Sequence, residues 1–422
     1  MILDWKGGVK MRSKLAKRTL IIVLGVCAVL AGLLTGGPAA QEPGKEKSPQ
    51  KGRIGTIGKG DAEITVLYLE GGPYEMGFQH GKLLKDKVKA CLSKVLDNCY
   101  KQIAAELLKG QPPGLARPLA NAFMDEAYKK MEPFVPDEYK EEMKGLAEGA
   151  DVPLADVRRV HAIPAITENS CSAFAAFGKA TKDGKLYQIR VLDYIMNFGL
   201  QDYPLITVYK PEKGNAFVNV GWVGFTGVVS GMNAKGLAVS EMGYGKPGQK
   251  QPGIPEPQPE ETLEGFPMIF LLKKILQRAD DVEEATKILK EAKGTNYYVY
   301  VIGDGITQDG KPAVRGYIMT KDFCKVYEPD KDSFPLPTVQ NAIYGSHYND
   351  RCYSLLKKLH GEIEPKVIMK KIIPEIAMES NLQSVVYEPA DLKLWVANAK
   401  GTTIRACDRD YVPFDFGKAL GK

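Results

Sequence analysis

Residues 168–194 read ENSCSAFAAFGKATKDGKLYQIRVLDY, and they mark a change in the periodicity of the chain. Upstream of this stretch, apolar residues recur at three- and four-residue steps, as on one face of an amphipathic helix. From Cys171 onward the period changes to two, which is typical of β-strands. The sequence Lys182-Asp183-Gly184 predicts a tight turn, so the stretch is interpreted as a β-hairpin. A cysteine therefore stands at the first position of the first strand.

The region before the hairpin is predicted to be mainly helical, and the region after it to alternate strands with helices. A strand at 63–71 precedes a helical stripe from Leu84 to Leu107. Further helices are predicted at 137–148, 153–162, 262–278, 281–293, 349–360 and 366–378, and further strands at 204–210, 216–223, 226–231, 236–242, 296–302, 313–320, 323–328, 383–388 and 392–397. Because short hairpins join most of these strands, we expect antiparallel sheets whose faces are covered by helices, an α+β fold.

The first 40 residues have the organisation of a secretory signal peptide. Basic residues from Arg12 to Arg18 precede the apolar run LIIVLGVCAVLAGLL and the small residues TGGPAA. We expect export to the periplasm or the extracellular space, with cleavage near Ala39 or Ala40 and no stable membrane span afterwards. A retained membrane anchor is the alternative, since the apolar run is only slightly short for a span. Residues 41–63 are polar and rich in Gly and Pro, as in a flexible linker.

The composition excludes several function classes. The 422 residues are 44% hydrophobic and 26% charged, with a net charge of +6. Outside the first residues the two signs are interspersed, so the sequence predicts no nucleic-acid surface. Seven cysteines without a CxxC pair, and four histidines without an HExxH motif, argue against a structural or catalytic metal.

The hairpin also brings chemically active residues together. Arg190 and Asp193 lie at the end of the second strand, which should fold back close to Cys171. A guanidinium and a carboxylate near a thiol can tune its ionisation. From spacing alone, however, a small buried cysteine beside a surface ion pair is the favoured interpretation.

The same stretch resembles the start of the catalytic chain in N-terminal-nucleophile (Ntn) hydrolases. The branch is that of isopenicillin N acyltransferase, or acyl-coenzyme A:6-aminopenicillanic acid acyltransferase, with bile-salt (choloylglycine) hydrolases and acid ceramidases as more distant relatives. Its pattern is Cys, a small hydroxyl residue, a D-G turn and Arg-x-x-Asp, filled here by Cys171, Ser172, Asp183-Gly184, Arg190 and Asp193. Upstream, residues 71–84 resemble the Gly…Glu-x-Gly…His-Gly stretch of this branch, and residues 228–243, 294–305 and 344–359 are similar to later family segments, all in the family's order. The chain departs from the pattern at Ser170, where relatives often have Gly or Asp, and at Val191 and Tyr194, where Asn and Trp are common.

The resemblance implies a four-layer αββα sandwich and a self-processed chain. The Cys171 thiol would attack the Ser170 carbonyl and cut the Ser170–Cys171 bond, giving a mainly helical small chain (64–170) and a catalytic large chain (171–422) that remain together as a heterodimer. Cleavage would liberate an α-amine on the nucleophile itself. An α-amine has a pKa of about 7.7–8.0, so it can accept the thiol proton near neutral pH.

The resemblance also implies roles for the other site residues. Asp193 would orient the α-amine, and Arg190 would favour the thiolate. Asn233 and Asn296 would stabilise the tetrahedral oxyanion. Arg351 would brace the site or meet an anionic substrate group.

Each of the last three residues has a simpler interpretation. Asn233 precedes Lys235-Gly236 and could be a turn residue, Asn296 could lie at a strand edge, and Arg351 could form an ordinary salt bridge.

The activity implied is hydrolysis of a small-molecule N-acyl amide, or transfer of its acyl group to another amine, through a thioester and without a cofactor. Two alternatives remain open. One is a papain-like cysteine protease that uses Cys171 and His347, and the other is a non-catalytic exported binding protein with the same fold.

Overall fold

The computed structural model describes residues 51–107, 113–167, 170–243, 261–305, 307, 309–331 and 336–422. The predicted signal peptide lies outside these residues.

Fifteen strands and the helices between them follow one another along the described chain. The strands are β1 (Arg53–Ile57), β2 (Ile64–Gly71), β3 (Ser170–Gly178), β4 (Gly184–Asp193), β5 (Pro204–Pro211), β6 (Phe217–Trp222), β7 (Ser230–Asn233), β8 (Leu237–Gly243), β9 (Tyr298–Asp304), β10 (Ala313–Met319), β11 (Cys324–Tyr327), β12 (Ala342–Ser346), β13 (Asn381–Glu388), β14 (Lys393–Asn398) and β15 (Val412–Asp415). The α-helices are α2 (Pro73–Leu83), α3 (Lys85–Leu107), α4 (Pro113–Met131), α5 (Asp137–Ala150), α6 (Leu154–Ile166), α7 (Met268–Arg278), α8 (Val282–Glu291), α9 (Asn349–Lys358), α10 (Pro365–Val367), α11 (Ile373–Ile376) and α12 (Phe416–Leu420).

The described strands form two sheets. One has nine strands in the order β1-β2-β5-β6-β7-β8-β9-β10-β11, and the other has six in the order β12-β3-β4-β13-β14-β15. Every pairing is antiparallel except β2 with β5. The antiparallel arrangement that the short connections predicted is therefore confirmed.

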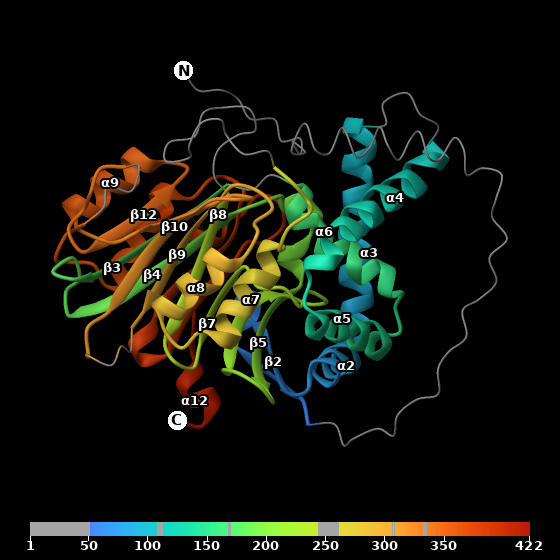
Figure 1. Cartoon of the computed structure of the whole chain (residues 1–422), viewed down its shortest axis with the longest axis horizontal. Helices are drawn as coiled ribbons and strands as arrows, with labels where there is room; N and C mark the ends of the chain where they lie inside the picture. Colours follow the sequence, from blue (N-terminus) through green and yellow to red (C-terminus); the bar gives the residue numbers. More distant parts are fainter. Residues whose placement is uncertain are drawn as a thin grey trace.

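The two sheets pack face to face between helical layers, which confirms the αββα sandwich (Figure 1). Helices α7 and α8 cover the nine-stranded sheet, and α9 with α11 covers the six-stranded one. The alternation of β3 divides its side chains between the layers. Cys171 and Ala173 pack in the same core as strands of the nine-stranded sheet, whereas Phe174 packs with the outer helices. The thiol therefore belongs to the interior of the sandwich.

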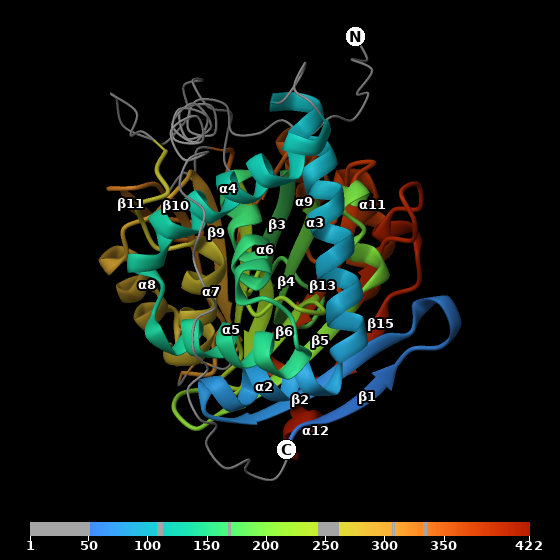
Figure 2. The same cartoon turned by 90° about the vertical axis from the view of Figure 1, so that its right-hand side faces the viewer.

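Helices α2 to α6 gather on one side of the sandwich (Figures 1 and 2). Helices α2 and α5 approach very closely because glycines face each other across the contact. A Cβ atom on Gly77 would lie 1.9 Å from the Glu142 carbonyl oxygen, and one on Gly145 would lie 2.1 Å from that of Tyr74. No side chain fits at either position without moving the helices apart.

Gly77→Ala is therefore expected to lower the free energy of unfolding by about 2 kcal/mol, the usual cost of an overpacked contact. Gly55→Ala is the matched control, since its Cβ would meet only the Tyr68 ring at 3.7 Å. Urea denaturation measures both. Equal midpoints for the two variants would contradict the close packing.

The structure differs from the predicted elements at several points. The helical stripe predicted from Leu84 to Leu107 is α3, but a separate helix, α2, precedes it, and the backbone of Leu84 between them (φ −117°, ψ 27°) is not helical. Helix α4 was not predicted, and it contains Pro118. The region predicted to be a flexible linker holds β1, which is ordered by pairing with β2.

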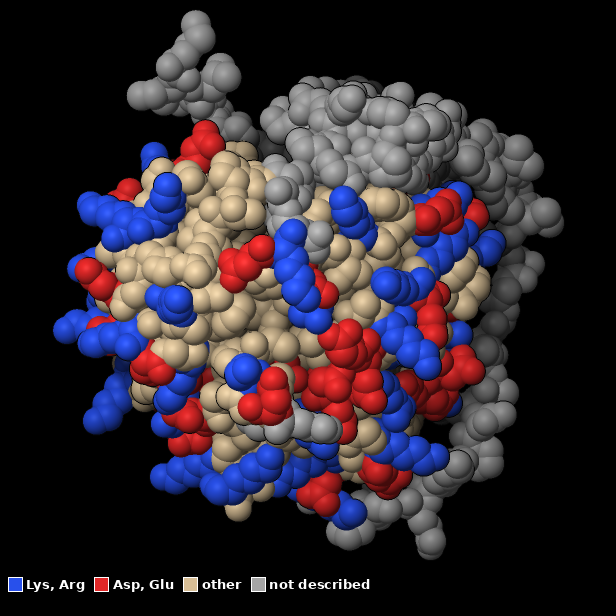
Figure 3. Space-filling model, turned by 60° about the vertical axis from the view of Figure 1, so that its left-hand side comes forward, with Lys and Arg blue, Asp and Glu red and all other residues tan. Residues whose placement is uncertain are grey.

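On the face shown in Figure 3, basic and acidic side chains are interspersed over the surface. Among the residues that the structure describes, no helix combines the length and the apolar composition that a membrane crossing requires.

Candidate active site

The β3–β4 hairpin brings Cys171, Arg190 and Asp193 together as the sequence predicted. In its antiparallel register Ser170 lies opposite Asp193, Cys171 opposite Leu192, and Ala173 opposite Arg190. The bond between Ser170 and Cys171 therefore lies directly beside the end of β4. Residues 179–183 connect the two strands, so the predicted turn at 182–184 overlaps only the end of this connection, and Gly184 begins β4.

The Cys171 thiol is buried, with only 4% of the residue exposed. Burial raises its pKa to about 12; Arg190 opposes this shift, and the charges of Glu241 and Asp193 add to it. A buried thiol of this kind stays protonated at neutral pH in the intact chain. Nucleophilic chemistry at Cys171 therefore requires a base close to its sulfur.

Arg190 is held by a carboxylate that was not identified from the sequence. Its Nη2 donates a hydrogen bond of 2.9 Å to Glu241 Oε2, and both side chains are almost completely buried. Burial opposes the charge of Arg190, but its interactions with Cys171 and Glu241 outweigh this effect and raise the pKa of the guanidinium. The sequence did contain a signal for this residue, because Glu241 is an acidic residue among apolar neighbours in the predicted strand 236–242. Its partner is far away in the sequence and could be found only in three dimensions.

Within the part of the chain that the structure describes, only one oxygen of the buried Asp193 carboxylate is hydrogen-bonded. Its Oδ1 accepts a hydrogen bond of 3.1 Å from the Met378 amide, whereas its buried Oδ2 has no hydrogen-bond partner among the described residues. Burial raises the pKa of Asp193 to about 7, against the lowering effects of the Met378 amide and Arg190. A carboxylate oxygen in this position can receive a new N–H group at the neighbouring Ser170–Cys171 bond.

The resemblance implies self-cleavage of the Ser170–Cys171 bond, and we expect the rate of this step to rise with an inflection near pH 7. Asp193 is protonated below its pKa of about 7 and ionised above it, and only the ionised carboxylate stabilises the amine that gains a proton as the peptide bond breaks. The measurement is a gel time course after transfer of uncut protein from pH 5 to a series of pH values.

The control for this experiment is Asp202→Asn, at an exposed carboxylate paired with Lys94, which should keep the inflection. Asp193→Asn should lose it and retain only the steady increase that thiol ionisation produces. The same profile in wild type and Asp193→Asn would contradict the role of this carboxylate.

The structure places Asn296 near the nucleophile segment. It is fully buried just before β9, and its Nδ2 donates to the carbonyl oxygen of Ala165 at the end of α6, the helix that leads to Ser170. Its Oδ1 has no partner among the described residues. The Asn296 Nδ2 donor is bonded to a backbone carbonyl oxygen. The predicted role of Asn296 in stabilising the oxyanion therefore stays a prediction.

Asn233 is committed to structural hydrogen bonds. Its Nδ2 donates to the carbonyl oxygens of Leu276 (3.1 Å) and Ala279 (2.8 Å), at the end of α7. Its Oδ1 accepts from the amides of Lys235 (3.1 Å) and Leu237 (3.0 Å). All the hydrogen-bonding positions of the Asn233 amide are therefore occupied, which agrees with its interpretation as a turn residue. The structure does not bring Asn233 into the cluster around Cys171.

Arg351 lies in the outer helical layer, in the first turn of α9. Its side chain is exposed, and Nη1 donates to the Glu375 carbonyl oxygen at 2.8 Å. Since α9 covers the face of the sheet opposite the Cys171 side chain, Arg351 braces α11 rather than contacting the thiol. His347 is also exposed and packs edge-on against Tyr348, with ring centroids 5.0 Å apart.

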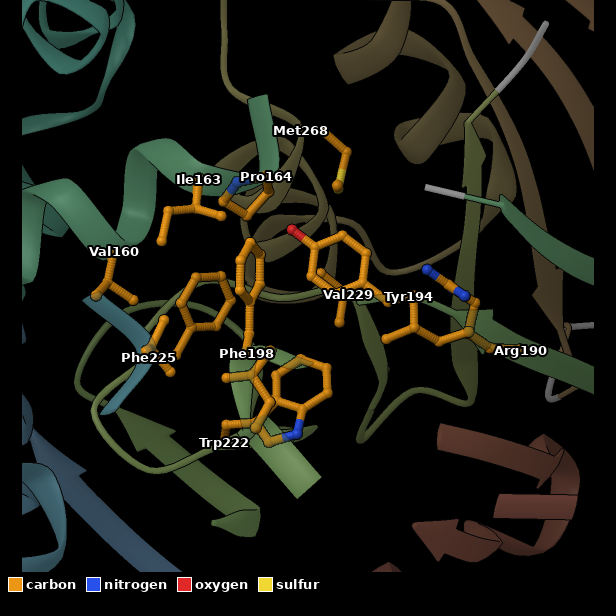
Figure 4. Close-up of a pocket in the computed structure, with 13 residues that line it drawn as sticks. Val160, Ile163, Pro164, Arg190, Tyr194, Phe198, Trp222, Phe225, Val229 and Met268 are labelled. Carbon is orange, nitrogen blue, oxygen red and sulfur yellow. The ribbon is translucent and has the colours of Figure 1, made fainter. Parts of the chain in front are cut away.

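An apolar pocket adjoins the catalytic hairpin. Arg190 and Leu192 line it, and Leu192 is the residue opposite Cys171. The cavity volume of the pocket is about 50 Å³. Its other walls come from aromatic residues of the large-chain segment and apolar residues of α3 and α6, among them Tyr194, Phe198, Trp222, Phe225, Val160 and Ile163 (Figure 4). Its lining is apolar apart from Arg190, as in pockets that bind the apolar part of a small molecule.

No group of three or more His, Cys, Asp or Glu side chains among the described residues is arranged to hold a metal ion. The six cysteines within the described ranges are all unpaired thiols.

The chain is similar in sequence to one family model and to several individual proteins. Residues 180–332 match the family model of acyl-coenzyme A:6-aminopenicillanic acid acyl-transferase. Protein dcd1A of Dictyostelium discoideum is 26% identical over 347 residues, which cover 74% of this chain and 74% of that protein. Protein dcd1B of the same organism is 28% identical over 257 residues, 58% of this chain; the chain spans about half the length of dcd1B (49%).

Two solved structures overlap part of the fold. The Caenorhabditis elegans ortholog of N-acylethanolamine-hydrolyzing acid amidase is 13% identical, with a TM-score of 0.39, and the match covers 52% of this chain and 93% of that one. A mutant of conjugated bile acid hydrolase from Clostridium perfringens is 13% identical, with a TM-score of 0.38 and coverage of 59% and 93%. The family match covers the segment that holds Arg190, Asp193 and Glu241, and it confirms the resemblance seen in the sequence to acyl-coenzyme A:6-aminopenicillanic acid acyl-transferases over residues 180–332.

Proposed function

We propose that this protein is an exported, self-processing cysteine hydrolase or acyltransferase that acts on a small-molecule N-acyl amide with an apolar acyl group. The observation that carries the proposal is the β3–β4 hairpin. It places a buried cysteine next to a cationic Arg190, and it places the Ser170–Cys171 bond beside Asp193, whose Oδ2 has no partner among the described residues. The charged and apolar order of residues 1–40 supports export.

Self-processing would begin with attack of the Cys171 sulfur on the carbonyl carbon of Ser170. The C–N bond of Ser170–Cys171 breaks, a thioester forms on the sulfur, and the nitrogen becomes an amine that takes up the thiol proton. Water then hydrolyses the thioester and releases the carboxyl end of Ser170. The two chains stay together because they share one core.

Catalysis would repeat this chemistry on the substrate. The α-amine of Cys171 accepts the thiol proton, and the thiolate attacks the amide carbonyl with Arg190 close to the sulfur. As the tetrahedral intermediate collapses, the protonated amine returns its proton to the leaving amine. Water or a second amine then takes the acyl group from the thioester.

The apolar pocket would bind the acyl chain. Each methylene group that it removes from water contributes about 0.8 kcal/mol to binding. We therefore expect amides of long or aromatic acids to be preferred over acetyl amides.

The direct test is to trap the acyl-enzyme. The purified protein is mixed with a series of N-acyl amides, quenched in acid after milliseconds to seconds, and analysed by mass spectrometry. We expect the large chain to gain the mass of the acyl group on Cys171, in wild type and in His347→Ala but not in Cys171→Ala.

Two outcomes would contradict the proposal. Loss of the adduct in His347→Ala would favour the papain-like alternative. The absence of any adduct or turnover across the series would favour a binding protein.

A further inference from the structure

Residues 223–229, between β6 and β7, form part of the pocket wall and are here called the pocket loop. Phe225 and Val229 of this loop line the pocket, next to Trp222 at the end of β6 (Figure 4). The position of these side chains, and so the shape of the pocket, depends on how the backbone of the loop is held.

Two buried histidines from the helical segment hold that backbone. His80 Nε2, on α2, accepts a hydrogen bond of 3.1 Å from the Gly224 amide. His161 Nε2, on α6, accepts one of 2.9 Å from the Thr226 amide, while its Nδ1 bonds the Val157 carbonyl oxygen at 2.7 Å. The His161 ring also stacks on Phe225, with centroids 4.7 Å apart.

A buried lysine fixes the same loop from the other side. Lys273 Nζ, on α7, donates to the Thr226 carbonyl oxygen at 2.9 Å and forms an ion pair with Glu142 on α5. Only about 1% of Lys273 and of Glu142 is exposed. The loop is thus bonded through both the N–H and the C=O of Thr226 to side chains outside the loop.

The histidines can accept these bonds only while they are neutral. Burial, together with the charge of Lys273, lowers the pKa of His80 to about 3, and burial lowers that of His161 to about 4. Both rings therefore remain hydrogen-bond acceptors over the physiological pH range.

We propose that His80 and His161 are positioning residues that set the shape of the acyl pocket through the pocket loop. The inference rests on the proposed function, since it assigns the pocket to the acyl group. Both histidines precede Cys171, whereas the pocket loop follows it. After processing, the small chain would therefore determine the acyl specificity of the nucleophile carried by the large chain. The Glu-x-Gly…His-Gly motif of residues 75–81 acquires a role: its glycines let α2 lie against α5, and its histidine reaches the loop.

The test uses full-length variants that either keep or remove the hydrogen-bond acceptor at the position of the histidine Nε2. In His80→Gln the amide oxygen takes about the place of Nε2, and in His80→Asn the side chain is too short to reach Gly224. His161→Asn likewise keeps a donor near Nδ1 but loses the bond to Thr226. His360→Leu is the control, because His360 bonds a backbone carbonyl (Gln340, 3.1 Å) in the outer helical layer, away from the pocket.

The first measurement is hydrogen–deuterium exchange of peptides that contain the pocket loop. We expect about tenfold faster exchange at Gly224 or Thr226 in His80→Asn and His161→Asn, the size that one lost hydrogen bond gives, and near wild-type exchange in His80→Gln and His360→Leu. Unchanged exchange in both Asn variants would overturn the proposal.

The second measurement separates positioning from general damage to the structure. The Asn variants should raise KM about tenfold for the preferred long-chain amide, and less for a short-chain one, with kcat and the alkylation rate of Cys171 within twofold of wild type. Equal losses of kcat for all substrates would overturn the proposal. If wild type turned over no N-acyl amide, the proposed function would have failed, and exchange of the loop would still decide whether the histidines hold it.

Discussion

Replacing Cys171 with alanine is expected to leave the chain uncut and to lower the hydrolysis of N-acyl amides by at least about a thousandfold. Removal of a covalent nucleophile leaves only the rate enhancement due to binding and oxyanion stabilisation. The buried thiol occupies the first position after Ser170 in β3, opposite Leu192 and next to the bond whose cleavage is proposed. The measurement is the steady-state rate, together with a denaturing gel.

The matched control is Cys352→Ala, a fully buried cysteine of α9 that packs among the outer helices. It should be processed and active, with a modest loss of stability. Comparable inactivation of both variants would contradict the assignment of the nucleophile. Activity that persisted in Cys171→Ala would contradict the whole catalytic mechanism.

Replacing Arg190 with leucine is expected to be the most destabilising change at the site. It leaves the fully buried Glu241 carboxylate without the guanidinium that bonds it at 2.9 Å, and breaking a buried ion pair from one side costs about 3–5 kcal/mol. The same change removes the cation that favours the Cys171 thiolate, so thiol alkylation at pH 8 should slow. Urea denaturation and alkylation rates measure the two effects.

The double variant Arg190→Leu/Glu241→Leu separates them. An apolar pair should recover most of the lost stability, because no buried charge is left unpaired, but it should not recover the reactivity of Cys171. The exposed pair Lys235–Asp280 is the control, where Lys235→Met should cost at most about 1 kcal/mol. If the double variant regained full activity, Arg190 would have only a structural role.

The parts of the fold that the sequence predicted are those specified by local pattern. The hairpin follows from period-two alternation and an Asp-Gly turn, and the register of Cys171 with the end of β4 follows from the hairpin. Helix α4 was missed because Pro118, in its interior, argues against a helix locally. Strands β12 and β15 were also missed. Both are short, and they are held by pairing with β3 and β14, which lie elsewhere in the sequence.

The site residues that were predicted are likewise those specified by local pattern, and those that were missed depend on tertiary contacts. Arg190 and Asp193 were predicted because they lie on the same hairpin as the cysteine. Glu241 was missed because its importance comes from a partner on another sheet, 51 residues away. Arg351 was predicted from order along the chain, but the face of a sheet that a helix covers is decided by tertiary packing. The histidine contacts to the pocket loop likewise join residues that no local pattern connects.

The proposed mechanism depends on Cys171 becoming an N-terminal residue, and intact mass with N-terminal sequencing of the purified protein, beside Cys171→Ala, tests this step. We predict two fragments in wild type, one of which begins Cys-Ser-Ala-Phe, and a chain without this cut in the variant. A single uncut chain in both samples would contradict the mechanism.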